Sequence, residues 1–171
     1  MNTSFWTFSV FLYHQPGVEE ECLSLQERFG VNVNVLLLCL YAGSEFGAIL
    51  SRGDIEAAER AIVEWERQVV KALRGLRQLL KRNAGRGEWP HAQSIKLLHT
   101  QIQDAELESE RIESAMLQEW LDGRLVHCSR SARHGAVITN LHVVRAHYGA
   151  GEGTEPWRHL VDLVLSRQSL P

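Results

Sequence analysis

The first third of the chain, residues 4–43, is the feature that most limits the possible folds. It is strongly apolar and aromatic, and only one Pro-Gly and one Phe-Gly stop interrupt it. Ser4 can cap a helix over Phe5–Tyr13, and apolar side chains lie on nearly every side of that helix, which predicts burial. We therefore expect an N-terminal aromatic subcore of short helices over residues 4–50.

Two more segments complete this subcore. Pro16 suits the first turn of a second helix, because that position needs no N–H, and Gly30 is a typical helix stop. The inner stripe of this helix has helical spacing and consists of Val18, Cys22, Leu25 and Phe29. The third segment, Val33–Tyr41, is either a helix or a buried strand. We favour the helix, because no other segment offers a strand partner.

Three patterns between Phe5 and Gly43 resemble a known family. They are FWxFSxxxY, PGVxxxCLxLQ and GVNVNVLLLCLYAG, and a similar spacing continues through Trp65, Arg74, Arg77 and Lys81. Together they resemble a proteobacterial family of small helical proteins that is known only as a domain of unknown function. The resemblance implies a short, soluble bacterial protein, and it assigns no catalytic residue to any position.

Composition predicts one domain over residues 1–171. The chain is 44% hydrophobic and 23% charged, which is ordinary for a globular protein of this length. Three scattered cysteines, Cys22, Cys39 and Cys128, are present, and two of them lie on apolar faces. We favour buried free thiols in a reducing compartment, and hence a cytoplasmic location, over the alternative of a Cys22–Cys39 disulfide. No secretory signal is visible, and Val33–Tyr41 is too short to span a bilayer, so we expect no membrane association.

Charge is distributed in blocks. Residues 51–86 carry nine basic and five acidic groups, whereas residues 87–122 carry two basic and eight acidic groups. The basic block predicts a helix over Asp54–Arg82 with Asp54 as its cap. Its apolar face is expected to contain Ile55, Ala58, Ile62, Trp65, Val69, Leu73, Leu76 and Leu80. A glycine inside this helix, Gly75, suggests close helix packing at that point.

The opposite face of this helix is the candidate partner-binding surface. It consists of Arg67, Lys71, Arg74, Arg77 and Lys81. A basic stripe can meet phosphate or an acidic partner, but an amphipathic helix needs a polar face in any case. The stripe is therefore either an external binding surface or a face that is solvated or paired within the fold.

A second long helix is expected over His91–Leu121, after a turn at Asn83–Pro90. The two helices should form an antiparallel αα-hairpin over residues 54–121. One edge of the second helix carries a candidate polar site, which consists of His99, Glu106, Glu110 and Glu113. These groups could bind a metal or a small ligand. We favour ion pairs with the basic helix, because no second helix offers matching ligands.

The C-terminal third predicts a loop and two closing helices. The loop covers Ser129–Gly135 in a His-rich stretch near Cys128, and the closing helices fall within residues 136–167. The first of them is expected near Ala136–Tyr148. The second is expected near Pro156–Ser166, with Thr154 as its cap.

The sequence predicts an all-α bundle of six or seven helices around a long central αα-hairpin. No phosphate loop, dinucleotide fingerprint, nucleophile elbow or Cys-x-x-Cys pair is present, so we expect no cofactor and no catalytic residue. The leading hypothesis is a non-enzymatic interaction or regulatory protein that uses the basic face to bind another protein or a second copy. The alternatives are an RNA- or ribosome-associated protein, with nucleic acid not favoured, and an enzyme or metal binder.

Overall fold

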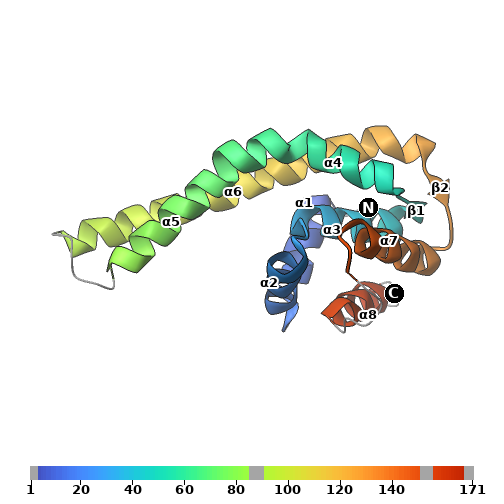
Figure 1. Cartoon of the computed structure of the whole chain (residues 1–171), viewed down its shortest axis with the longest axis horizontal. Coiled ribbons are helices and arrows are strands. Elements are labelled where there is room, and N and C mark those ends of the chain that lie inside the picture. Colours follow the sequence, from blue (N-terminus) through green and yellow to red (C-terminus); the bar gives the residue numbers. More distant parts are fainter. Residues whose placement is uncertain (1–3, 85–90, 151–155, 168–171) are drawn as a thin grey trace. The chain divides into compact units, whose positions relative to one another are not determined.

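The computed structural model describes residues 4–84, 91–150 and 156–167, and helices make up almost all of this part of the chain (Figure 1). The helices form seven continuous stretches in the described residues, which confirms the predicted all-α fold. Contacts divide the chain into two compact units. We call them the core unit, Met1–Ala61 with Leu117–Pro171, and the hairpin unit, Ile62–Met116. That residues 1–171 form a single domain stays a prediction.

The core unit begins with helices α1 (Phe5–Tyr13) and α2 (Val18–Phe29). The Ser4 cap is confirmed, because the Thr7 N–H donates to its hydroxyl at 3.2 Å. The predicted place of Pro16 is wrong. Gly17, with φ +80°, is the N-cap residue, and α2 begins at Val18. Pro16 therefore lies in the turn before the helix.

Helix α3 (Val33–Phe46) is the central helix of the core unit. Every side chain from Val35 to Ser44 is buried, so the helical interpretation of this segment is confirmed. The helix runs five residues past its expected end at Tyr41. Gly47, with φ +62°, ends it.

The expected loop over Ser129–Gly135 is largely wrong. Strand β2 (Ser129–Arg130) pairs antiparallel with β1 (Ala48–Ile49), and helix α7 (Arg133–His147) begins before the expected loop ends. A short 3₁₀ turn, η2 (Leu125–His127), comes just before β2. The Ser131 N–H donates to the Gly47 carbonyl at 2.9 Å, and this close approach extends the pairing beyond the strands.

A buried amide joins α7 to this pairing. The Asn140 side chain donates to the carbonyls of Cys39 and Ala48, at 2.8 and 2.9 Å, and accepts from the Leu50 N–H at 2.8 Å. These bonds satisfy three of its four hydrogen-bonding positions in the interior. Sequence patterns gave no signal for this role, because Asn140 lies inside an apolar helix.

Helix α8 (Pro156–Arg167) completes the core unit, close to its predicted bounds. It buries Trp157, Leu160 and Val164. Its expected cap, Thr154, lies outside the described residues. In the part of the chain that the structure describes, no single helix is long and apolar enough to cross a membrane. Among the described helices, one pair, α2 and α3 taken together, passes that test, and the chain bends by 119° between them.

One continuous helical run contains α4 (Arg52–Trp65), the π-helical turn η1 (Glu66–Val70) and α5 (Lys71–Ala84). Its cap is Ser51 and not Asp54, so the predicted cap is wrong. The Ser51 hydroxyl accepts from the Asp54 N–H at 3.3 Å, and the Asp54 carboxylate accepts from the Ser51 N–H at 2.8 Å. This is a reciprocal capping box.

The hairpin unit pairs η1 and α5 with the first part of α6 (Ala92–Arg124), side by side (Figure 1). The predicted apolar face of the basic helix is wrong in part, because Leu76 is 43% exposed and Val70 is buried instead. The π-helical turn η1 lies between α4 and α5 and interrupts the regular 3.6-residue spacing on which the prediction relied, although Leu80 is buried as predicted. A side chain at Gly75 has open space around it, so the expected close packing there is also wrong. The remainder of the expected turn, residues 85–90, lies outside the described residues.

Candidate functional site

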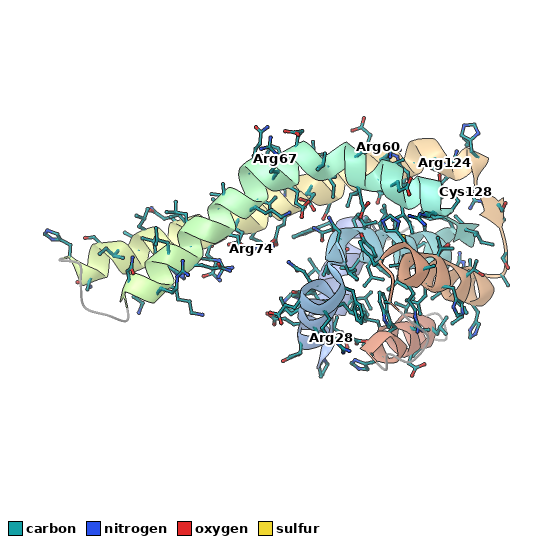
Figure 2. The ribbon with its side chains drawn as sticks, in the orientation of Figure 1. Arg28, Arg60, Arg67, Arg74, Arg124 and Cys128 are labelled. Atoms are coloured by element: carbon teal, nitrogen blue, oxygen red, sulfur yellow. The ribbon has the colours of Figure 1, made fainter. Side chains whose placement is uncertain are left out.

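The predicted basic face lies on η1 and α5, where Figure 2 labels Arg67 and Arg74. Most of its side chains are paired within the hairpin unit. Arg67 pairs with Glu64 at 2.9 Å, and Lys71 pairs with Glu66 at 3.3 Å. The second pair spans five positions, a spacing that the π-helical turn brings onto one side of the helix. Lys81 is exposed near the end of α5.

Arg74 and Arg77 form a network with the acidic edge of α6. Arg74 donates through Nε to Glu106 Oε1 at 3.1 Å and through Nη2 to Glu110 Oε1 at 2.7 Å. Arg77 donates through Nε to Glu106 Oε2 and through Nη2 to Glu106 Oε1 at 3.2 Å. Charge-assisted bonds of this forked kind fix orientation as well as distance. We call Arg74, Arg77, Glu106 and Glu110 the ion-paired flank.

The two carboxylates of this flank respond differently to their surroundings. Burial acts to raise the pKa of Glu106, but hydrogen bonds from Arg77 and Arg74 outweigh it and hold that pKa below its ordinary value. Burial dominates at Glu110 and raises its pKa, despite the bond from Arg74. Glu106, whose side chain is 7% exposed, is therefore the charged centre of the network at neutral pH.

Reversing the charges of Arg77 and Glu106 tests the pairing. Each single reversal, Arg77→Glu or Glu106→Arg, is expected to destabilise the protein, because it places like charges together. The double variant should recover about 1–2 kcal/mol, because the buried group at position 106, then a guanidinium, regains an oppositely charged partner. Denaturant titration of the four proteins measures this coupling. The same cycle on the exposed pair Glu108 and Arg111 is the control and should show much weaker coupling. Additive effects at Arg77 and Glu106 would show that the pair does not hold the hairpin together.

The structure does not gather the predicted polar site into one ligand set. Glu106 and Glu110 meet through Arg74, whereas His99 lies about 10 Å from Glu106 along the helix axis, two turns away. Glu113 is buried in the same helix. Among the described residues, no group of three or more His, Cys, Asp or Glu side chains is placed to hold a metal ion.

The cysteines are poor nucleophiles. Cys22, Cys39 and Cys128 are all free thiols, and the first two are buried, as expected. Burial raises the pKa of Cys22 to about 12 and raises that of Cys39 further. It also raises the pKa of the half-buried Cys128. Thiols that stay protonated at neutral pH do not support nucleophilic catalysis.

A half-buried polar cluster that the sequence did not reveal ties α7 to α4 inside the core unit. The Tyr148 hydroxyl donates to Glu59 Oε1 at 2.5 Å, and His147 Nε2 lies 3.2 Å from Glu59 Oε2. Burial and the neighbouring Glu59 both raise the pKa of Tyr148, so the phenol stays protonated. A protonated phenol that donates to a carboxylate anchors the end of α7, and its arrangement indicates a structural role.

A second acid–histidine pair joins α2 to α8. His159 Nδ1 lies 3.2 Å from Glu21 Oε2, and Glu21 is buried. Burial raises the pKa of Glu21 from 4.5 to about 6, although His159 acts to lower it. Between these pH values the folded chain binds more protons than the unfolded chain. Its free energy of unfolding therefore falls as the pH rises through this window.

Glu21→Gln removes this titration. From pH 4.5 to pH 7, we expect the stability difference to move in favour of the variant by about 1–2 kcal/mol, because the parent alone must ionise a buried carboxyl group. Denaturant titrations at several pH values measure the difference. Glu20→Gln, at the exposed neighbouring position, is the control and should follow the parent. A constant difference between Glu21→Gln and the parent across this range would contradict the assignment.

The side of the hairpin opposite the ion pairs is apolar. Relative to the buried Leu80, Arg77 and Arg74 lie about 60° and 120° to one side of α5, whereas Leu76 and Leu79 lie about 40° and 100° to the other. Leu76 and Leu79 are therefore placed away from the arginines, although all four belong to the same helix.

Helix α6 has the same asymmetry. Relative to Glu106, Glu110 lies about 40° to one side, whereas Leu98, Ile112 and Met116 lie about 80–120° to the other. Because Arg74 reaches Glu110, the apolar sides of the two helices share one flank of the hairpin. We call this the apolar flank, and its five members are between 36% and 45% exposed: Leu76, Leu79, Leu98, Ile112 and Met116.

Comparisons with known proteins place the chain in a family. A family profile described as "Protein of unknown function (DUF2390)" matches residues 4–117, which is two thirds of the chain and includes both α1–α3 and the hairpin unit. No curated protein and no solved structure gives a match. The expected resemblance to a family of unknown function is thus confirmed, whereas its proteobacterial origin stays a prediction, and the chain belongs to the DUF2390 family of proteins of unknown function.

Proposed function

We propose that this protein is a non-enzymatic interaction module, and that the apolar flank of the hairpin unit is its contact surface. The observation that carries the proposal is the contrast between the two flanks. On one flank the charged side chains form ion pairs with each other, whereas on the other flank five large apolar side chains are exposed to water. An exposed apolar stripe of this kind is typical of a surface that binds another macromolecule.

The proposal moves the contact surface away from the predicted basic face. Arg74 and Arg77 donate their hydrogen bonds to Glu106 and Glu110, so binding an external anion through them has to compete with partners already in place. The apolar flank has no such competition. Burying it on a partner removes apolar surface from water, which is the main favourable term in protein association.

An RNA- or ribosome-associated role is a second candidate with less support. It rests on the exposed Lys81 and Arg82 at the end of α5, where phosphate could approach. The net charge of −3 and the acidic neighbouring helix oppose such binding. An enzymatic role has no ligand set or activated nucleophile in the described residues to support it. The three free cysteines support a reducing bacterial cytoplasm as the location we propose.

Site-specific photo-crosslinking in cells tests the proposal. A photo-reactive amino acid at the position of Leu76 or Leu98 should give discrete crosslinked protein species. The control positions are Leu97 and Leu107, which are even more exposed, at 62% and 55%, but lie off the apolar flank. Equal crosslinking at all four positions, or none at Leu76 and Leu98, would contradict the proposal.

A further inference from the structure

We propose a second contact surface, on the core unit, that binds an acidic segment of another protein. It lies where η2, β2 and the start of α7 follow one another, and Figure 2 labels Arg124 and Cys128 on either side of η2. We call this surface the basic corner, and its four members are His127, Arg130, Arg133 and His134. The inference goes beyond the proposed function and does not depend on the apolar flank.

The basic corner belongs to a long part of the chain without carboxylate side chains. Residues 123–150 contain four arginines and four histidines, and no aspartate or glutamate. Neighbouring members of the corner are at most three positions apart, so their Cα atoms are separated by at most about 11 Å. This distance is close to the Debye length of about 8–10 Å at physiological salt, so the cationic groups act together on one ligand.

The charge of the basic corner is not neutralised within the described residues. No ion pair joins any of its four members to a carboxylate there. The preceding arginine, Arg124, differs, because it pairs with Asp54 at 2.5 Å. The exposed Asp122 accepts a hydrogen bond from the Gln118 amide. All four members of the corner are exposed, so a partner can reach the fixed charges of the arginines and the N–H donors of the histidines.

Neutral groups hold Arg130 in place. Its Nη1 donates to the Phe46 carbonyl at 2.7 Å, and its Nη2 donates to the Leu125 carbonyl at 3.0 Å. Carbonyl oxygens fix the guanidinium without cancelling its charge, and three of its five N–H groups remain for a partner. The first turn of α7 adds to the positive potential, because it has no acidic residue and no side-chain cap at Ala132. A surface that is ordered before binding loses little entropy when a partner docks.

The size and surroundings of the corner favour an acidic protein segment over nucleic acid. Its two arginines are too few for the about 6–10 phosphate contacts of a tight nucleic-acid complex, and the net charge of −3 repels a long polyanion. Val126, beside the corner, is 79% exposed, more than any other large apolar side chain in the described residues. A protein segment can cover it, whereas phosphates cannot. Arginine is also the cation enriched at protein interfaces.

Fluorescence anisotropy of the full chain with a labelled peptide tests this surface. The probe is a short peptide in which several glutamates flank one leucine, and the reference peptide has glutamine at each glutamate. Arg133→Glu should weaken binding of the glutamate peptide about tenfold, because attraction becomes repulsion, and added salt should weaken binding to the parent. This change places a carboxylate in the first turn of α7, where it favours the helix, so the fold is retained.

Arg60→Glu is the matched control. It makes the same charge reversal at an exposed arginine of α4 in the core unit, and it should bind the peptide like the parent. Three results would overturn the inference: equal binding by the parent and Arg133→Glu, equal affinity of the parent for the two peptides, or no binding of the glutamate peptide at about millimolar concentration. A labelled RNA duplex that binds more tightly than the peptide, and is lost with Arg133→Glu, would assign the corner to nucleic acid instead.

Photo-crosslinking in cells identifies the chemistry of the partner. A photo-reactive amino acid at the position of Val126 should crosslink a protein segment with net negative charge, which mass spectrometry of the crosslinked peptide reads directly. Arg133→Glu should reduce the yield, whereas Arg60→Glu should not. A neutral or basic crosslinked segment would overturn the inference. Acidic crosslinks at Val126 together with none at Leu76 would contradict the proposed function alone, so the two failures are distinguishable.

Discussion

Phe8→Ala is expected to lower the free energy of unfolding by about 3–5 kcal/mol, enough to unfold a large fraction of a domain of ordinary stability. Phe8 is 0% exposed in the core unit, and its ring lies 5.3 Å from that of Tyr41, centroid to centroid. Removing the ring leaves a cavity between α1 and α3, in addition to the lost burial. Denaturant titration of the parent and the variant measures the difference.

Phe11→Ala is the matched control for this change. It removes the same side chain from the same helix, but Phe11 is 43% exposed, so a much smaller effect is expected. Trp6, which is half-buried, should give an intermediate result. Equal stabilities for the Phe8 and Phe11 variants would show that α1 does not pack as described.

Gly43→Ala is expected to cost about 2–3 kcal/mol, although alanine is the better helix former. Helices α3 and α7 touch through their backbones at this point. A methyl group on Gly43 lies 2.8 Å from the Val137 nitrogen and 2.9 Å from its Cα. Backbone atoms cannot turn aside as side chains can, so the two helices have to separate. Thermal and denaturant unfolding both report this loss.

Gly75→Ala is the opposite case and serves as control. Gly75 also lies inside a helix, but a side chain there meets open space. The same substitution should therefore stabilise the protein by about 0.5–1 kcal/mol through helix propensity. If Gly43→Ala left the stability unchanged or raised it, as Gly75→Ala should, the close contact between α3 and α7 would be wrong.

Local signals in the sequence were enough to predict the helices. Ser4 and Gly30 are cap and stop residues whose roles depend on neighbouring backbone groups, and both predictions are confirmed. The end expected at Tyr41 was wrong, because α3 passes through Gly43, which is in contact with α7, and ends only at Gly47. Long-range packing of this kind leaves no local pattern. The pairing of β1 with β2 was missed for the same reason, since two residues are too few to show alternation.

Of the two flanks of the hairpin, only the ion-paired flank could be predicted from the sequence. The opposed charge blocks of the two long helices indicated ion pairs, and Arg74 and Arg77 do bond Glu106 and Glu110. The sequence pattern did not reveal the apolar flank, because regular helical spacing placed Leu76 on the inner face of the helix. The π-helical turn η1 breaks that spacing, and no residue type in Glu66–Val70 marks it. Whether any of these residues binds a partner stays a prediction.

The most direct test of the account compares side-chain labelling of the protein in intact cells with that of the purified, dilute protein. Carbene footprinting reports the solvent exposure of individual side chains. The account predicts that Leu76, Leu79 and Leu98 are strongly protected in cells and labelled in dilute solution, while Leu97 and Leu107 are labelled equally in both. Equal labelling of Leu76, Leu79 and Leu98 in cells and in dilute solution would contradict the claim that the apolar flank is a contact surface.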